Sequence, residues 1–150
     1  MSINIIFNQP KFAANIGTIM RSAELFGADK VIVVSTDDNL YHATDTAKSY
    51  ARIGYTAHSF DKALNMVRGS TLIAVEMGEN ATSLHTFAHP NDVTYIFGSE
   101  DKGLSDAELS RCNQQIVIPT EKPWSLNVAQ AATAVLWDRY AQYLTLSLKH

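Results

Sequence analysis

Gln115-Ile116-Val117-Ile118-Pro119, followed shortly by Ser125-Leu126-Asn127-Val128-Ala129-Gln130-Ala131-Ala132, is the stretch that decides the fold. Its first part predicts a short buried strand over 115–118, and its second part begins a long helix over 127–146. The polar residues 120–125 form an elbow between them. Because the first N–H groups of a helix have no partner inside it, such an elbow can bind polar atoms of a ligand.

The rest of the chain repeats this alternation of strands and helices. Continuous Val and Ile runs such as 31–34 are typical of parallel strands that are buried on both faces. The pattern predicts an α/β domain, with a mostly parallel sheet covered by helices on both faces. The expected strands are 3–7, 31–34, 71–75, 93–97 and 115–118, and the expected helices are 12–26, 60–67, 105–112 and 127–146. Residues 43–51 are a further helix candidate, and 76–91 are expected to be a loop with one short turn near 84–87.

Composition narrows the class of protein. A chain of 150 residues with 46% apolar residues has the size of one domain with a real core. Its net charge of −3 does not indicate a polyanion partner, and Cys112 is alone, which fits a reducing compartment. The first residues resemble a strand and not a signal peptide, and no apolar run approaches the roughly 20 residues of a membrane span. We therefore expect a soluble cytoplasmic protein of one domain, 1–150, with no membrane contact.

Three polar segments are candidates for one shared site. Asn15, Gly17 and Arg21 lie on the first expected helix, and residues 98–105 and 120–127 each follow a buried strand. Ligands of open parallel sheets bind beyond the carboxyl ends of the strands. Each segment also has a plain structural explanation: a solvated arginine beside a tolerated helix glycine, a Gly-rich connection, and Asn127 as a helix cap. Those explanations do not account for all three segments falling at strand exits or on a helix face beside them.

The final helix is apolar on more than one side, since Leu136, Trp137, Tyr140 and Leu144 spread well around it. Such a helix needs two neighbours. One is its own sheet, and we expect the other to be a second copy of the chain. The alternative is a deeply packed terminal helix.

Taken together, the polar segments resemble the three motifs of the SpoU/TrmH family. The resemblance is carried by Asn15-x-Gly17-x-x-x-Arg21, by Phe97-Gly98-Ser99-Glu100-x-x-Gly103-Leu104-Ser105, and by Ile118-Pro119 with Ser125-Leu126-Asn127-Val128. Members are S-adenosylmethionine-dependent RNA ribose 2′-O-methyltransferases of the SPOUT superfamily. The resemblance covers residues 3 to about 143 and implies a C-terminal deep trefoil knot and a homodimer with a composite active site. It is closest to the minimal members without an appended RNA-binding domain.

The resemblance also implies roles for individual residues. The expected catalytic residues are Arg21, Asn15, Glu100, Ser125 and Asn127, and the expected contacts to S-adenosylmethionine are Val75, Gly98, Ile118, Ser125 and Leu126. Because a guanidinium stays protonated near neutral pH, we expect Arg21 to fix a phosphate and stabilise developing alkoxide, and not to act as a base. Glu100 would orient Arg21 or Asn15. The partner is RNA, either tRNA or rRNA, which could dock on a basic rim and on two aromatic side chains: Lys11, Arg21, Lys102, Arg111 and Lys122, with Trp124 and Phe12.

Other functions are weaker candidates. One alternative is a catalytically silent RNA-binding dimer of the same fold, and another is an α/β regulator that binds a nucleotide. His85 and His89 have the four-residue spacing of metal ligands on a helix, but Pro90 follows and no Cys or carboxylate cluster completes a site. We therefore expect no metal. Cys112 has no base partner in the sequence and is interpreted as structural.

Overall fold

The computed structural model describes residues 1–37 and 48–150 and contains a seven-stranded sheet in the order β3-β2-β1-β6-β4-β7-β5. Every described pair of neighbouring strands is parallel, so the carboxyl ends of all the strands lie at one edge. The parallel sheet predicted from the Val and Ile runs is thereby confirmed. The strands are β1 (Ser2–Asn8), β2 (Lys30–Val34), β3 (Gly54–Ala57), β4 (Thr71–Val75), β5 (Thr82–Ser83), β6 (Asp92–Phe97) and β7 (Gln114–Val117).

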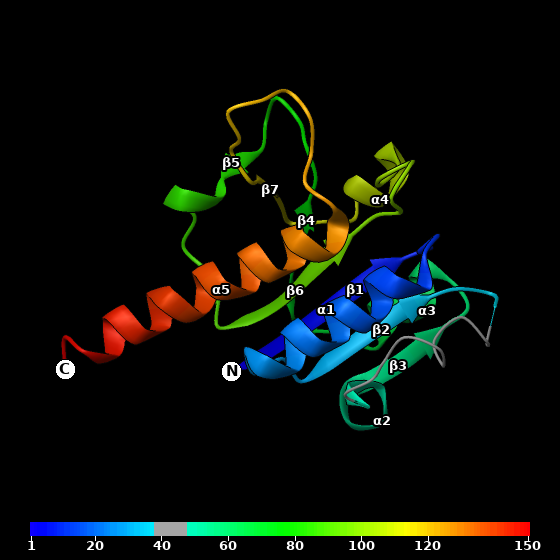
Figure 1. The fold of residues 1–150 in the computed structure, drawn as a ribbon, viewed down its shortest axis with the longest axis horizontal. Coiled ribbons are helices and arrows are strands. Elements are labelled where there is room, and N and C mark those ends of the chain that lie inside the picture. The colour runs from blue at the N-terminus through cyan, green and yellow to red at the C-terminus, as the bar shows by residue number, and fades with distance from the viewer. Residues whose placement is uncertain (38–47) are drawn as a thin grey trace.

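Helices cover both faces of the sheet, as predicted. Along β1, Ile5 and Phe7 pack into one core and Ile6 into the other, because successive strand residues point to opposite faces. The first core includes α1 and α5, which lie side by side along one face (Figure 1). The second core includes α3, and α4 packs against it through Leu109. The helices are α1 (Ala13–Leu25), α2 (Ser49–Ile53), α3 (Phe60–Asn65), η1 (Leu84–Thr86), α4 (Asp106–Leu109) and α5 (Val128–Ser147).

The contact between α1 and α5 positions the first polar segment against the last. Ile16, Ile19 and Met20 are buried on α1, and Ser22 Oγ lies 2.7 Å from Thr133 Oγ1 on α5. Gly17 is also buried, so the missing side chain leaves room for protein packing at that point. The α1 helix ends at Leu25, and two residues later Gly27 has a φ of 80°, which is readily adopted only by residues without a Cβ.

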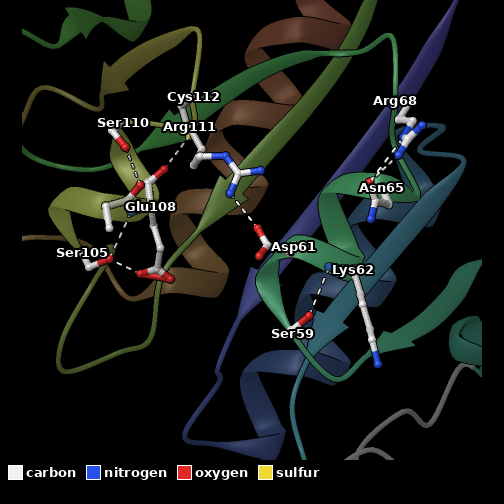
Figure 2. Close-up of polar contacts among 11 residues, drawn as sticks. Ser59, Asp61, Lys62, Asn65, Arg68, Ser105, Glu108, Ser110, Arg111 and Cys112 are labelled. Carbon is white, nitrogen blue, oxygen red and sulfur yellow. Dashed lines mark hydrogen bonds and ion pairs between the residues drawn. The ribbon is translucent and has the colours of Figure 1, made fainter.

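The second face is held by a polar contact between two short helices. Ser105 caps α4 and forms the predicted capping box with Glu108. Arg111, just beyond α4, donates to Asp61 of α3 at 2.6 Å (Figure 2). Glu108 also accepts from the buried side-chain amide of Asn8, which ties α4 to the end of β1. The helix ends at Leu109 and not at 112, because the N–H groups of Arg111 and Cys112 donate to carbonyls three residues back and not four.

Two short strands were not predicted. Residues 54–57 form β3 beside β2, and residues 82–83 within the expected loop form β5 beside β7. Both are edge strands of two to four residues, too short to show a periodic pattern. The helix expected over 43–51 falls partly outside the described residues, and within them α2 begins at Ser49. In the parts of the chain that the structure describes, no helix is long and apolar enough to cross a membrane.

Candidate functional site

A pocket of about 520 Å³ opens at the carboxyl edge of the sheet. Its walls come from the residues that follow three neighbouring strands, β4, β6 and β7, and from the first turn of α5. Ligand sites of open parallel sheets lie at this edge. The lining comprises residues 75–77, 97–103, 117–118, 120, 124–128 and 131.

Glu100 and Asn15 connect the three polar segments beside this pocket. Glu100 accepts from the side-chain amide of Asn15 at 3.0 Å and from the backbone N–H groups of Lys11 and Phe12 at 2.6 and 3.3 Å. The Asn15 carbonyl oxygen in turn accepts from Asn127 Nδ2 at 3.1 Å. The chain Glu100–Asn15–Asn127 therefore joins the loop after β6, the start of α1 and the start of α5.

Asn127 also begins the last helix. Its Oδ1 accepts from the N–H groups of Ala129 and Gln130 at 2.9 and 3.3 Å, so Asn127 is the N-cap of α5. The cap uses only the side-chain oxygen of Asn127, so its side-chain nitrogen remains for the hydrogen bond to Asn15.

Gly98 allows two backbone segments to touch at the back of the pocket. A Cβ at this position would lie 2.1 Å from the backbone carbon of Gly103 and 2.5 Å from the nitrogen of Leu104. Gly103 has a φ of +64°, and its own Cβ would meet the carboxylate of Glu76 at 2.4 Å. The loop from Gly98 to Leu104 thus folds back on itself and closes with a bridge between Ser99 and Gly103.

Glu76 is a pocket residue that the sequence analysis missed. It follows β4 directly, and its carboxylate accepts from Leu104 N at 3.0 Å and from Met77 N at 3.1 Å. The carboxylate therefore holds the loop after β6 against the loop after β4. The sequence did contain a signal for Glu76: it directly follows the expected strand 71–75, at the same edge of the sheet as the other polar segments.

The expected cofactor contacts line this one pocket, and the expected catalytic residues divide into two groups. Glu100, Ser125 and Asn127 line the pocket, and Asn15 bonds to two of them. Arg21 lies on α1, with an exposed side chain, outside the residues that line the pocket. It follows Asn15 by six residues, roughly 9 Å along the helix axis. The lining residues expected to contact the cofactor are Val75, Gly98, Ile118, Ser125 and Leu126.

The expected basic rim is divided as well. Lys102 lines the pocket with an exposed side chain, whereas Arg111 is paired with Asp61 on α3 (Figure 2). Lys11 lies 3.2 Å from Asp101, and its hydrogen bond lowers the pKa of that carboxyl below the ordinary value. The pocket entrance therefore carries both positive and negative side chains.

The two histidines with metal-ligand spacing contact different groups. His85 Nδ1 bonds to Ser83 Oγ at 2.7 Å, whereas His89 lies between the Tyr95 hydroxyl and Asp138, the latter at 2.8 Å. Burial lowers the pKa of His89, and the Asp138 hydrogen bond opposes that shift. Among residues 1–37 and 48–150, no group of three His, Cys, Asp or Glu side chains could hold a metal ion.

Cys112 has the environment of a structural residue. Its side chain is half-buried against the second core, and burial together with the nearby Glu108 charge raises the pKa of its thiol to about 11. The thiolate is the nucleophilic form of cysteine, so this group is unreactive near neutral pH.

With this geometry in place, comparison with known proteins defines the class. The profile of the SpoU rRNA Methylase family matches residues 2–137, nearly the whole chain. The chain belongs to this family. The motifs that define the pocket all fall inside the matched region.

Individual relatives agree with this assignment. The chain is 26% identical to a 23S rRNA (uridine(2479)-2′-O)-methyltransferase of Streptomyces viridochromogenes, over 95% of this chain and 54% of that protein. It is 28% identical to the 23S rRNA (guanosine-2′-O-)-methyltransferase RlmB of Acinetobacter baylyi, over 87% and 56%. The crystal structure of the SpoU methyltransferase AviRb from Streptomyces viridochromogenes, in complex with the cofactor AdoMet, superposes with a TM-score of 0.85 at 25% identity, over 95% of this chain and 58% of that one. The chain thus spans just over half the length of these relatives.

Proposed function

We propose that this protein transfers a methyl group from S-adenosylmethionine to a ribose 2′-hydroxyl of RNA. The observation that carries the proposal is a pocket lined by two of the family motifs and joined to the third by the Glu100–Asn15–Asn127 hydrogen-bond chain. Relatives in the same family are named as RNA 2′-O-methyltransferases. The RNA is tRNA or rRNA, and the protein would meet it in the cytoplasm.

The pocket residues fit S-adenosylmethionine. A volume of about 520 Å³ lies within the range of sites for cofactor-sized ligands. Val75, Ile118 and Leu126 offer apolar surface to an adenine ring, and Ser125 offers a hydroxyl. When bound, the cofactor supplies an activated methyl group on a positively charged sulfur. An AviRb structure contains this cofactor in the same fold.

The protein's own contribution is mainly positioning. Glu100 acts as an orienting group and not as the base, because its two oxygens already accept from three N–H donors. It fixes Asn15, and Asn15 with Asn127 and Ser125 would hold the ribose. The guanidinium of Arg21 would hold the adjacent phosphate and stabilise charge on the 2′-oxygen as its proton leaves to a phosphate oxygen or water.

A homodimer would bring Arg21 to the pocket. Arg21 is exposed on α1 and does not line the pocket of its own chain. Just after α1 lies an exposed aromatic cluster, in which the rings of Trp137 and Tyr140 on α5 pack on Phe26 with centroid distances of 6.0 and 5.8 Å, and Trp137 is 53% exposed. Tyr143 and Leu144 extend the apolar surface along α5. A second copy seated on this surface would cover it and direct its Arg21 at the first copy's pocket.

A trefoil knot in the C-terminal half is part of the same proposal. Its support is the strand order, in which β4 lies between β6 and β7, so the chain crosses over β4 after leaving β6. The loops that follow β4, β6 and β7 all line one pocket, which places the crossing next to the proposed cofactor site.

Two measurements test the function. Isothermal calorimetry with S-adenosylmethionine should show binding to the purified protein, and radiolabelled methyl transfer to tRNA or rRNA lacking the modification should follow, mapped to a 2′-oxygen. RNA binding without affinity for S-adenosylmethionine would favour the silent RNA-binding dimer. Affinity for NAD or ADP alone would favour the nucleotide-binding regulator.

A further inference from the structure

We propose that Trp124 is a stacking platform for an unpaired base of the substrate, so that the protein takes its target nucleotide from a single-stranded RNA loop and not from a duplex. The inference rests on the proposed function and deepens it by assigning the structural class of the RNA. It follows from one side chain, its surroundings and the charges next to it.

Trp124 is exposed to solvent in a polar surface loop, an environment in which tryptophan is uncommon. It lies in the loop between β7 and α5, where every residue from Pro119 to Asn127 is exposed, and its own exposed fraction is 67%. Its side chain also lines the pocket. A tryptophan carries the largest apolar surface of any residue, so leaving it in water beside a polar site indicates a ligand that covers it.

Most of the other exposed aromatic side chains already pack against a ring or a cation, and the exposed Tyr143 lies on α5 outside the residues that line the pocket. Trp137 packs on Phe26 and Tyr140, the Lys11 ammonium lies 5.5 Å from the Phe12 ring centre, and the Lys30 ammonium lies 5.7 Å from that of Tyr55. Within the described parts of the chain, no ring or cation packs over the indole of Trp124. Its faces are therefore available for stacking.

The charges beside this ring suit a nucleotide. Lys102 lines the same pocket, and Lys122 lies two residues before Trp124 in the exposed loop. These ammonium groups can contact phosphates on either side of a base that stacks on the ring. A neutral apolar ligand would not explain them.

A stacked base at this position must be unpaired. In an A-form duplex each base is covered on both faces by its neighbours, so an indole cannot reach it. In a loop the base can turn out onto the ring, and its ribose is then carried toward the Asn15–Asn127 pair at the pocket. Unpaired loops are therefore the RNA class that the geometry favours.

The test is binding of a fluorescently labelled RNA hairpin with an unpaired loop, compared with a blunt duplex of the same stem, measured by anisotropy at fixed salt. Trp124→Ala should weaken hairpin binding roughly 5- to 150-fold, the range for loss of one base stack, and leave duplex binding unchanged. Trp124→Phe should restore most of the loss. The control Tyr55→Ala changes an exposed ring on distant β3 and should leave both affinities unchanged.

Calorimetry of the wild-type protein with S-adenosylmethionine completes the test, because it reports on the proposed function separately from RNA binding. Equal losses on hairpin and duplex, or no loss on either, would each overturn the inference. If the wild-type protein methylates RNA while Trp124→Ala binds hairpins normally, stacking is refuted and the proposed function stands. If hairpin binding depends on Trp124 but S-adenosylmethionine never binds, methyl transfer is refuted and the stacking contact stands.

Discussion

Asn127 donates its side-chain amide to Asn15 Oδ1 at 3.1 Å while its own carbonyl oxygen caps α5. The residue that begins the last helix is therefore also the residue that ties that helix to the first one at the pocket. The helix cap and the hydrogen bond to Asn15 use different atoms of one side chain, so the two contributions can be separated by substitution.

Asn127→Asp should separate them. A carboxylate keeps the cap on α5 but loses the N–H donor to Asn15, so we expect near-normal thermal stability and much lower methyl transfer. Asn127→Ala should lose both, at a cost of about 1 kcal/mol in the free energy of unfolding. Urea unfolding and a methyl-transfer assay on the two variants measure this. Equal activity of wild type and Asn127→Asp would show that the bond to Asn15 has no role at the site.

Gly98→Ala should damage the pocket specifically. Its Cβ would collide with the backbone of Gly103 and Leu104, which cannot move aside as a side chain can. We expect a loss of about 1–3 kcal/mol in the free energy of unfolding and weaker binding of S-adenosylmethionine. Gly78→Ala is the matched control, since its Cβ would meet only the flexible amide of Gln115. Differential scanning calorimetry and cofactor titration should show a larger loss of stability and of cofactor affinity for Gly98→Ala than for Gly78→Ala.

The sequence predicted those structural features that depend on residues close together in the chain. Val and Ile runs predicted the central strands, and Ser105 with Glu108 predicted the capping box, because each pattern involves neighbours in the chain. The motifs predicted that Asn15, Gly17 and Arg21, residues 98–105 and residues 120–127 belong to one site, and of the first segment Asn15 bonds to pocket residues while Arg21 lies outside the pocket lining. Edge strands β3 and β5 were missed because two to four residues carry no periodicity.

Contacts between distant segments were the part that sequence reasoning could not supply. Nothing near Glu76 in the chain shows that its carboxylate holds Leu104, 28 residues away. Likewise, the position of Arg21 on α1 follows from its helical spacing, but its distance from the pocket depends on how α1 lies across the sheet. Tertiary packing decides both, and only a resemblance to a family could anticipate them.

His89 should make the stability of the fold depend on pH. Burial lowers the pKa of this imidazole below its ordinary 6.5, and Tyr95, Asp138 and Arg139 face it. Between the lowered pKa and 6.5 the unfolded chain binds a proton that the folded chain does not. The free energy of unfolding should therefore be fully present above about pH 6.5 and fall as pH drops, by up to about 1.4 kcal/mol per pH unit, levelling off below the folded-state pKa.

Urea midpoints measured between about pH 7.5 and 5 on the wild type and His89→Gln test this pH effect. The variant should be less stable at high pH but should lose less stability on acidification. His85→Gln, which changes an exposed histidine on η1, should follow the wild-type curve. Parallel curves for the wild type and His89→Gln would mean that another group causes the slope.

Trp137→Glu should prevent the proposed dimer from forming. The substitution places a charge in the cluster of Phe26, Trp137 and Tyr140, which burial against a second copy would have to desolvate. Sedimentation velocity should show dimers for the wild type and monomers for the variant, with circular dichroism unchanged. Tyr55→Glu makes the same change on β3 and should remain dimeric. Monomeric wild-type protein at micromolar concentration would contradict the dimer and, with it, the composite site.

Arg21→Ala should abolish methyl transfer and leave affinity for S-adenosylmethionine within a few-fold, because Arg21 lies outside the residues that line the pocket of its own chain. The same variant also tests which subunit supplies this side chain.

When Arg21→Ala and Gly98→Ala are refolded together, half of the dimers contain one chain of each variant. In such a heterodimer the pocket of the Arg21→Ala chain is intact, and the intact Arg21 belongs to the Gly98→Ala chain. A composite site should then recover about one quarter of wild-type activity, since half of the dimers are mixed and each has one complete site of two. No recovery, with heterodimers verified by native mass spectrometry, would place Arg21 in the pocket of its own subunit.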